Sequence, residues 1–104
     1  MFTQLTNETF AHVIADTQYG VLLIFKNLCP HCKNMEKVLE KFSKKVSDVA
    51  FYCLDSERDN VAMKALEVER VPTVLIIKNG HVINKKAGLM NPREMLEFYK
   101  QTQR

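Results

Sequence analysis

Residues 21–42 read VLLIFKNLCPHCKNMEKVLEKF, which joins two unlike hydrophobic patterns. The run Val21–Phe25 is apolar throughout, which predicts a strand buried on both faces. After Cys29 and Cys32, apolar residues recur at the i, i+3, i+4, i+7 spacing of a helix, at Met35, Val38, Leu39 and Phe42. The first cysteine is therefore expected at the junction between the end of a buried strand and the N-terminus of an amphipathic helix.

A thiol at that junction is expected to be reactive. The first backbone N–H groups of a helix have no partner inside it, and with the helix dipole they favour a thiolate. Both effects lower the pKa of Cys29. Cys32 lies one turn later and can close or resolve a disulfide, while Pro30 presets φ for the first helical turn. The pattern predicts a redox-active dithiol.

Two other interpretations of the cysteine pair stay open. The pair could be inert core cysteines, or half of a zinc site, which usually needs four ligands in two pairs. The further ligand candidates Cys53, His12 and His81 are isolated in the sequence. Haem attachment is excluded, because Lys33 and not a histidine follows the second cysteine. We favour the dithiol and expect no metal and no cofactor.

The composition is that of an ordinary globular protein, with 46% hydrophobic and 26% charged residues. We expect a single domain over residues 1–104. The net charge of +3 comes without a run of Lys and Arg, which argues against nucleic-acid binding. No apolar run approaches a membrane span, and residues 1–8 do not resemble a signal peptide. These features predict a cytoplasmic protein, in which a C-x-x-C is catalytic or metal-binding.

The remaining patterns predict alternating strands and helices. Strands are expected at residues 2–5, 21–26, 49–55, 74–78 and 81–85, and helices at about 7–16, 30–45, 60–66 and 92–101. The caps are expected at Thr6 or Asn7, at Asp59 or Asn60, and at Asn91. Gln18-Tyr19-Gly20 is expected to break the chain, and Asn79-Gly80 to form a hairpin turn. The order predicts a mixed sheet with helices on both faces.

This order and three motifs resemble the thioredoxin family. The motifs are Cys29-Pro30-His31-Cys32, Val71-Pro72-Thr73 and Lys78-Asn79-Gly80, followed by Gly88. A lone C-x-x-C is a weak signal, but its combination with V-P-T some forty residues later and then K-N-G is specific. The resemblance covers nearly the whole chain and implies the α/β thioredoxin fold, with a mixed central sheet flanked by helices on both faces.

The resemblance also implies roles for individual residues. Cys29 is similar to the family's exposed nucleophile and Cys32 to its buried resolving thiol. Pro72 is similar to the cis-proline, whose loop faces the disulfide and leaves the Val71 backbone free to pair with a substrate; Thr73 and Gly88 belong to the same substrate-binding region. The expected activity is thiol–disulfide exchange that reduces protein disulfides, by a monomer that receives electrons from a reductase.

The sequence departs from the family pattern at several positions. Leu28 replaces the Trp that typically precedes the first cysteine. Leu23 and Phe51 replace a buried Asp and its Lys partner, which is consistent because a buried charge without its partner is costly. This double change removes the usual proton acceptor for Cys32, so water or His31 must serve.

The dipeptide between the cysteines is Pro30-His31, as in periplasmic dithiol oxidases of the same superfold, where thioredoxins have Gly-Pro. A His31 ring in the first helical turn could stabilise the Cys29 thiolate by charge or hydrogen bond. A more stable thiolate makes the couple more oxidising. A dithiol oxidase or isomerase-like protein is therefore an alternative, and a module that holds a metal or iron–sulfur cluster is another.

Four further residues are assigned from their positions. Lys26, Lys33 and Arg70 are expected to border the active site, and Arg70 either selects acidic partners by its charge or is merely solvated. We favour the solvated reading of Arg70. Cys53 lies in an expected buried strand and is interpreted as a core residue.

Overall fold

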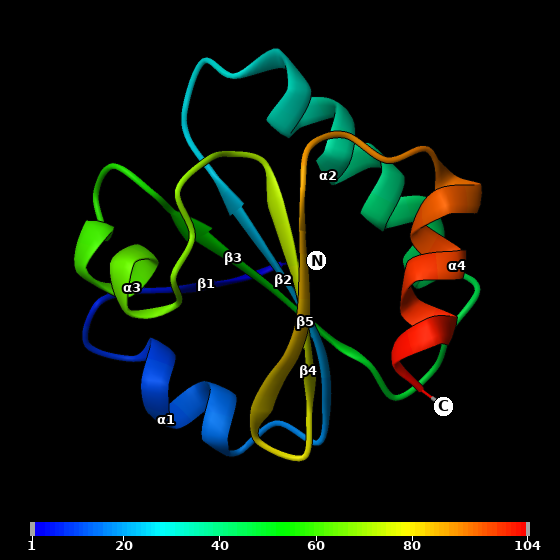
Figure 1. Cartoon of the computed structure of the whole chain (residues 1–104), viewed down its shortest axis with the longest axis horizontal. Coiled ribbons are helices and arrows are strands. Elements are labelled where there is room, and N and C mark those ends of the chain that lie inside the picture. Colours follow the sequence, from blue (N-terminus) through cyan, green and yellow to red (C-terminus); the bar gives the residue numbers. More distant parts are fainter. Residues whose placement is uncertain (1, 104) are drawn as a thin grey trace.

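A five-stranded β-sheet lies between two pairs of α-helices in the computed structural model, which describes residues 2–103 (Figure 1). The strands are β1 (Thr3–Leu5), β2 (Tyr19–Phe25), β3 (Ala50–Asp55), β4 (Thr73–Lys78) and β5 (His81–Ala87). The helices are α1 (Phe10–Ala15), α2 (Pro30–Ser43), α3 (Asn60–Ala65) and α4 (Pro92–Thr102). The predicted order of strands and helices is confirmed.

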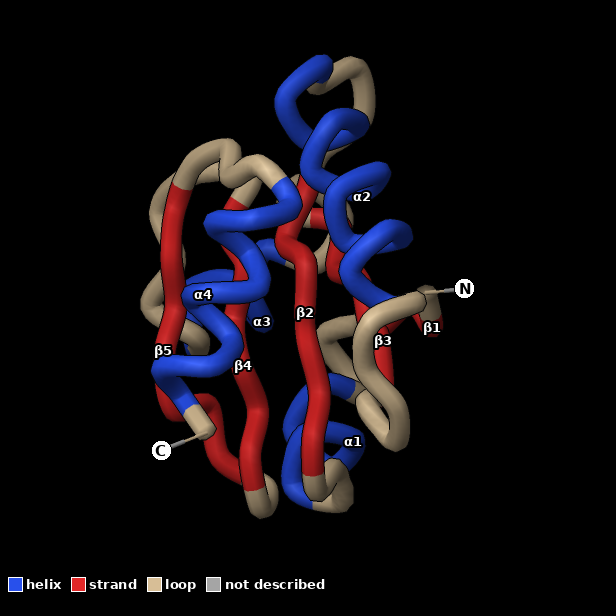
Figure 2. The backbone as a smooth tube through the Cα atoms, turned by 90° about the vertical axis from the view of Figure 1, so that its right-hand side faces the viewer, coloured by secondary structure: helices blue, strands red, loops and turns tan. Residues whose placement is uncertain are grey.

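The sheet has the strand order β1-β3-β2-β4-β5, with β2 at its centre (Figure 2). β2 pairs in parallel with β3 and antiparallel with β4, and the Asn79-Gly80 turn joins β4 to the antiparallel β5. Both turn residues have positive φ, 51° and 81°, as the predicted hairpin turn requires. The sheet is therefore mixed, as expected.

Each face of the sheet carries its own apolar core. Val21 and Leu23 of β2 belong to the cluster beneath α2 and α4. Leu22 and Ile24 belong to the cluster beneath α1 and α3. All four are at most 1% exposed. The prediction that this strand is buried on both faces is confirmed, and burying each such side chain contributes about 1.5–3 kcal/mol.

The predicted start of the first helix is wrong. α1 begins at Phe10 rather than directly after Thr6 or Asn7. Asn7 instead caps a different helix, because its Oδ1 accepts a hydrogen bond from the Ala62 N–H in α3 at 2.8 Å. In return the Asn7 N–H donates to Asp59 Oδ1 at 3.0 Å. The side chain of Asp59 therefore does not cap its own helix, as the sequence suggested it could.

Two other predictions need correction. Tyr19 and Gly20 do not break the chain but begin β2, where a Cβ on Gly20 would come within 2.8 Å of the Thr17 Cγ2. Most of β3 is half-buried rather than buried, including Cys53. The three-residue edge strand β1 covers only residues 52–54 of β3, so the beginning of β3 has a neighbour on one side only.

Candidate active site

The cysteine pair lies where the sequence places it, between the end of β2 and the beginning of α2. Residues 26–28 connect the two elements, and Leu28 has a φ of 58° and a side chain that is 94% exposed. Cys29 is the N-cap of α2, with extended backbone angles of −113° and 105°, and Pro30 follows at the first helical position. The apolar Leu28 side chain therefore stands in solvent directly beside the first thiol.

Capping brings the two cysteines into contact. The Cys29 Sγ accepts a hydrogen bond from the Cys32 N–H at 3.3 Å, and the Cys29 carbonyl accepts one from the Lys33 N–H at 3.1 Å. Both cysteines are free thiols. Cys29 was expected to be exposed, but only 8% of its surface is, against 3% for Cys32. The cap turns the Cys29 sulfur back over the helix end, which reduces its exposure.

The pKa values of the two thiols are shifted in opposite directions. A hydrogen bond from the Cys32 thiol lowers the pKa of Cys29, and the backbone N–H groups of Cys32 and His31 and the charge of Lys26 lower it further, against the effect of burial. Burial and the hydrogen bond to Cys29 raise the pKa of Cys32 to about 11. At neutral pH the pair therefore holds one activated sulfur and one protonated sulfur.

His31 and Pro30 are both exposed in the first turn of α2. The sequence led us to expect that the His31 ring stabilises the Cys29 thiolate, but the group of His31 that lowers the pKa of Cys29 is its backbone N–H. Pro30 supplies the restricted φ of the first helical position and has no N–H that would lack a partner there. The local geometry of this turn thus comes from the C-P-H-C sequence itself.

The Val71-Pro72 peptide bond is cis, as the family resemblance implied. The Pro72 carbonyl accepts a hydrogen bond from the Gly88 N–H at 2.8 Å, and Gly88 has a φ of 96°, which favours glycine. The Thr73 Oγ1 donates to the Arg70 carbonyl at 2.7 Å. Within residues 2–103 the backbone N–H and carbonyl of Val71 form no hydrogen bond, so both are available.

An open cavity of about 460 Å³ brings part of the expected site together. It is lined by Lys26, Cys29, Ser56, Met63, Glu69, Arg70 and Val71. Lys26, Cys29, Arg70 and Val71 were expected there, whereas Lys33, Pro72, Thr73 and Gly88 do not line it. Ser56 was missed, although one signal predicts it: β2 and β3 are parallel neighbours, so residues after their carboxyl ends meet at one edge of the sheet.

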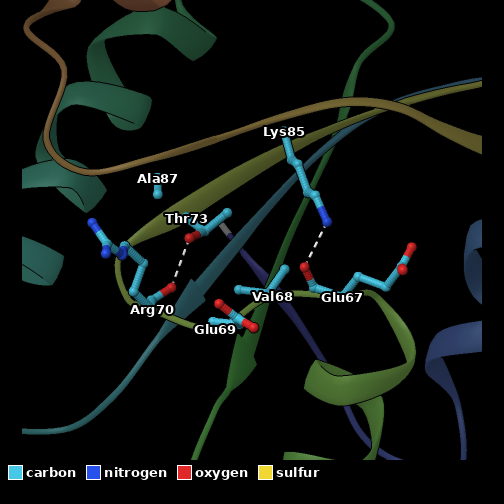
Figure 3. A pocket seen from close by; sticks show the side chains of 7 residues that line it. All are labelled: Glu67, Val68, Glu69, Arg70, Thr73, Lys85 and Ala87. Atoms are coloured by element: carbon cyan, nitrogen blue, oxygen red, sulfur yellow. Dashed lines mark hydrogen bonds between the residues drawn. The ribbon is translucent and has the colours of Figure 1, made fainter.

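A second cavity, of about 310 Å³, is lined by residues of the segment before β4 and of β5 (Figure 3). Thr73 lines this cavity together with Glu69 and Arg70, which border both cavities. Its far wall is formed by β5, where the Lys85 ammonium donates hydrogen bonds to the Leu66 carbonyl at 3.3 Å and to the Glu67 carbonyl at 2.5 Å. Glu69 and Arg70 are thus the two residues that the cavities share.

The positions of the missing Asp–Lys pair are apolar in the structure. Leu23 is 1% exposed and belongs to the core cluster under α2, and Phe51 packs against the same cluster. Cys53 pairs with Leu23 across the parallel strands. Burial raises the pKa of Cys53, and the charge of Glu36 adds to this. The third cysteine is therefore a half-buried, protonated thiol rather than a fully buried core residue.

Two further findings apply to the described part of the chain. Among residues 2–103, no three His, Cys, Asp or Glu side chains gather closely enough to hold a metal ion. Within the same residues, no helix combines the length and apolar character needed to cross a membrane.

The chain is similar to known proteins in both sequence and structure. The family model described as Thioredoxin matches residues 1–101. Thioredoxin-1 of Saccharomyces cerevisiae is 37% identical over 90 residues, which cover 85% of this chain and 86% of that protein. The solution structure of reduced desulfothioredoxin from Desulfovibrio vulgaris Hildenborough has a TM-score of 0.87 at 41% identity, covering 96% of both chains.

A second similar structure concerns the structural basis of the thiol resolving mechanism in yeast mitochondrial 1-Cys peroxiredoxin via glutathione/thioredoxin systems. It has a TM-score of 0.86 at 28% identity, and the match covers 96% of this chain and 94% of that one. The residues matched by the family model include every candidate site residue from Cys29 to Gly88.

Proposed function

Because this chain belongs to the thioredoxin family, has the thioredoxin fold and is a thiol–disulfide oxidoreductase, we propose that its Cys29 attacks the disulfides of protein substrates and that Cys32 resolves the product. The observation that carries these roles is the hydrogen-bonded pair at the start of α2. Cys29 accepts from both the backbone and the thiol of Cys32, which leaves one sulfur ready to attack and the other protonated.

The exchange balances in two steps. The Cys29 thiolate attacks one substrate sulfur, which forms a mixed disulfide and releases the other substrate sulfur as a thiolate. Cys32 then loses its proton and attacks the Cys29 sulfur, which releases the second substrate thiol. Two electrons pass to the substrate, and the Cys29–Cys32 disulfide remains. Since Leu23 offers no carboxylate behind Cys32, the proton leaves to water or to His31.

Substrate binding is assigned to the cis-proline region. The unpaired N–H and carbonyl of Val71 suit an extended substrate backbone, because strand pairing needs one donor and one acceptor. Pro72, Thr73 and Gly88 hold this segment through the two hydrogen bonds described above. Arg70 lies beside it, at the rim of the cavity that contains Cys29.

We assign the protein to the cytoplasm as a monomer, with disulfide-containing proteins as substrates and a separate reductase as the electron donor. One similar structure concerns the thiol resolving mechanism of a peroxiredoxin, which supports proteins of this kind as substrates. In a reducing compartment the net direction of electron flow is from the dithiol to the substrate.

The roles of the two cysteines are tested by Cys32→Ser. The variant should retain attack by Cys29 but lose resolution, so it should accumulate a mixed disulfide that runs as a higher band on a non-reducing gel. Cys29→Ser should form none, and Cys53→Ser should behave as the unchanged protein. Equal trapping by the Cys29 and Cys32 variants would contradict the assignment.

The direction of electron flow is tested by the reduction potential of the Cys29–Cys32 pair. We expect a value near that of thioredoxin, about −270 mV. One observation supports the alternative, a more oxidising protein. The pKa of Cys29 is lowered, and a stabilised thiolate stabilises the reduced form. A value near −120 mV, roughly that of strong dithiol oxidants, would replace our proposal by this one.

A further inference from the structure

The cavity beside Cys29 is bordered by two cations. Lys26 enters from the segment after β2, and Arg70 from the segment before the cis-proline. Both residues are exposed, and the charge of Lys26 is close enough to Cys29 to lower the pKa of its thiol. The nucleophile thus shares one open cavity of about 460 Å³ with an ammonium and a guanidinium group.

These cations are not neutralised by the protein itself. Within residues 2–103 the only ion pair joins Arg58 and Asp59, so neither Lys26 nor Arg70 has a carboxylate within 4.0 Å. Glu69 also lines the cavity, but the Arg70 guanidinium extends away from the Glu69 carboxylate (Figure 3). The hydrogen bond from Thr73 to the Arg70 carbonyl fixes the backbone from which the guanidinium extends. The cavity therefore presents two unpaired positive charges against one negative charge.

We propose that this cavity receives an acidic side chain of the substrate, one or two residues away from the cysteine that Cys29 attacks. A substrate strand that pairs with the Val71 backbone advances about 3.3 Å per residue, which places such a side chain within about 7 Å of the reacting sulfur. The inference rests on the proposed function and adds a substrate class to it: disulfides flanked by Asp or Glu are preferred to those flanked by Lys.

The test uses three synthetic peptides that differ only in the residue next to a single cysteine, which is Glu, Gln or Lys. Each cysteine carries the same small neutral thiol as a mixed disulfide. Rates of reduction by the reduced protein are measured at low ionic strength and divided by the rates with a neutral dithiol reagent, which removes the intrinsic reactivity of each disulfide. We expect the Glu peptide to react about threefold to tenfold faster than the Lys peptide, the range for one or two partly exposed charge pairs.

Variants locate the preference. Lys26→Gln and Arg70→Gln should each reduce the Glu-to-Lys rate ratio, and Glu69→Gln should increase it. Lys37→Gln is the matched control, because it removes the same charge from an exposed position on α2 outside the cavity. Lys26→Gln also changes the Cys29 pKa, but that affects all three peptides alike and cancels in the ratio. About 0.5 M salt should abolish most of the preference.

Three results would overturn the inference, the last of them together with the proposed function. If Lys37→Gln lowers the ratio as much as Lys26→Gln and Arg70→Gln, the preference comes from net charge and not from the cavity. If the unchanged protein reduces all three peptides at the same normalised rate, the cavity does not select charge, although disulfide reduction itself stands. If even the Gln peptide is not reduced, the proposed function fails, and the inference fails with it.

Discussion

The first turns of α2 and α4 share one architecture. Each has an N-cap residue with an extended backbone, Cys29 or Asn91, followed by a proline at the first helical position. In each, the side chain of the cap accepts a hydrogen bond from the backbone N–H three residues later, at 3.3 Å for the sulfur and 2.8 Å for the amide oxygen. The two helix ends differ in the chemistry of the capping atoms and in burial, since the Cys29 cap is buried and the Asn91 cap is exposed.

That difference separates stability from reactivity. In α4 the Glu94 carboxylate completes the cap by accepting from the Asn91 N–H at 3.0 Å. In α2 the residue at the same place is Cys32, whose thiol donates to the Cys29 sulfur instead. An amide cap accepts a hydrogen bond from a free backbone N–H of the helix and is chemically inert. A sulfur cap that accepts from the same N–H groups is stabilised as a thiolate. The active site is thus a helix cap built from sulfur.

The largest expected effect concerns the two thiols of α2. At pH 8 a thiol with a pKa of about 11 is only about 0.1% thiolate, while the pKa of Cys29 lies below its ordinary value of 9.0. Iodoacetamide should therefore modify Cys29 at least about 100-fold faster than Cys32 in the reduced protein. The Cys29 rate should rise with pH through its lowered pKa and then level off, well before Cys32 begins to react near pH 11.

The measurement is the initial rate of alkylation at each cysteine, followed by mass spectrometry of the digested protein from pH 5 to pH 10. Cys53→Ser removes the third thiol, whose pKa is raised by burial, and should leave both rates unchanged. Comparable rates for Cys29 and Cys32 at pH 8 would show that the sulfur cap does not distinguish the thiols.

The second prediction compares the loss of each cap residue in its effect on stability and on activity. Asn91→Ala should lower the free energy of unfolding by about 1 kcal/mol, the usual cost of losing an N-cap, and the melting temperature by about 4–8 °C. Its disulfide reduction rate should not change. Cys29→Ser should do the reverse: activity is lost, but stability stays within about 0.5 kcal/mol, because serine is a good N-cap. Stability is measured by thermal melts of the reduced proteins, and activity by the rate of disulfide reduction. Loss of activity in Asn91→Ala would show that the two caps do not separate stability from reactivity.

How much of the molecule the sequence predicts depends on how local its interactions are. The starts of α2 and α4 were predicted because each cap bonds a residue only three positions away. The start of α1 was mispredicted because Asn7 caps α3, 55 residues further along the chain. No local pattern distinguishes a cap for the next helix from a cap for a distant one.

The site follows the same rule. The cysteine pair and the cis-proline segment were each recognisable as short motifs, but the cavity between them was not. Ser56, Met63 and Glu69 enter it from segments that only the folded sheet brings next to Cys29. The exposure of Cys29 was also overestimated. Its sulfur is buried because the cap turns it back over the helix end, and this orientation depends on the cap geometry and not on the residue type.

The smallest expected effect separates two contributions of His31 to the sulfur cap. Its backbone N–H is the last and weakest of the groups that lower the pKa of Cys29. His31→Ala removes the ring and keeps the N–H, so it should leave the Cys29 pKa and the reduction potential almost unchanged. His31→Pro removes both and is tolerated in the first helical turn. It should raise the Cys29 pKa and make the couple slightly less oxidising, since a weaker thiolate means a less stable reduced form.

The readouts are the thiolate absorbance near 240 nm as a function of pH and the potential against glutathione buffers. Pro30→Ala is the control, because it changes the same turn without touching a group that bonds the sulfur. If His31→Ala raises the Cys29 pKa as much as His31→Pro does, the imidazole ring itself stabilises the thiolate, and the sequence-based hypothesis is right. If neither variant changes the Cys29 pKa, that pKa is lowered by the Cys32 thiol, the Cys32 N–H and the charge of Lys26 alone.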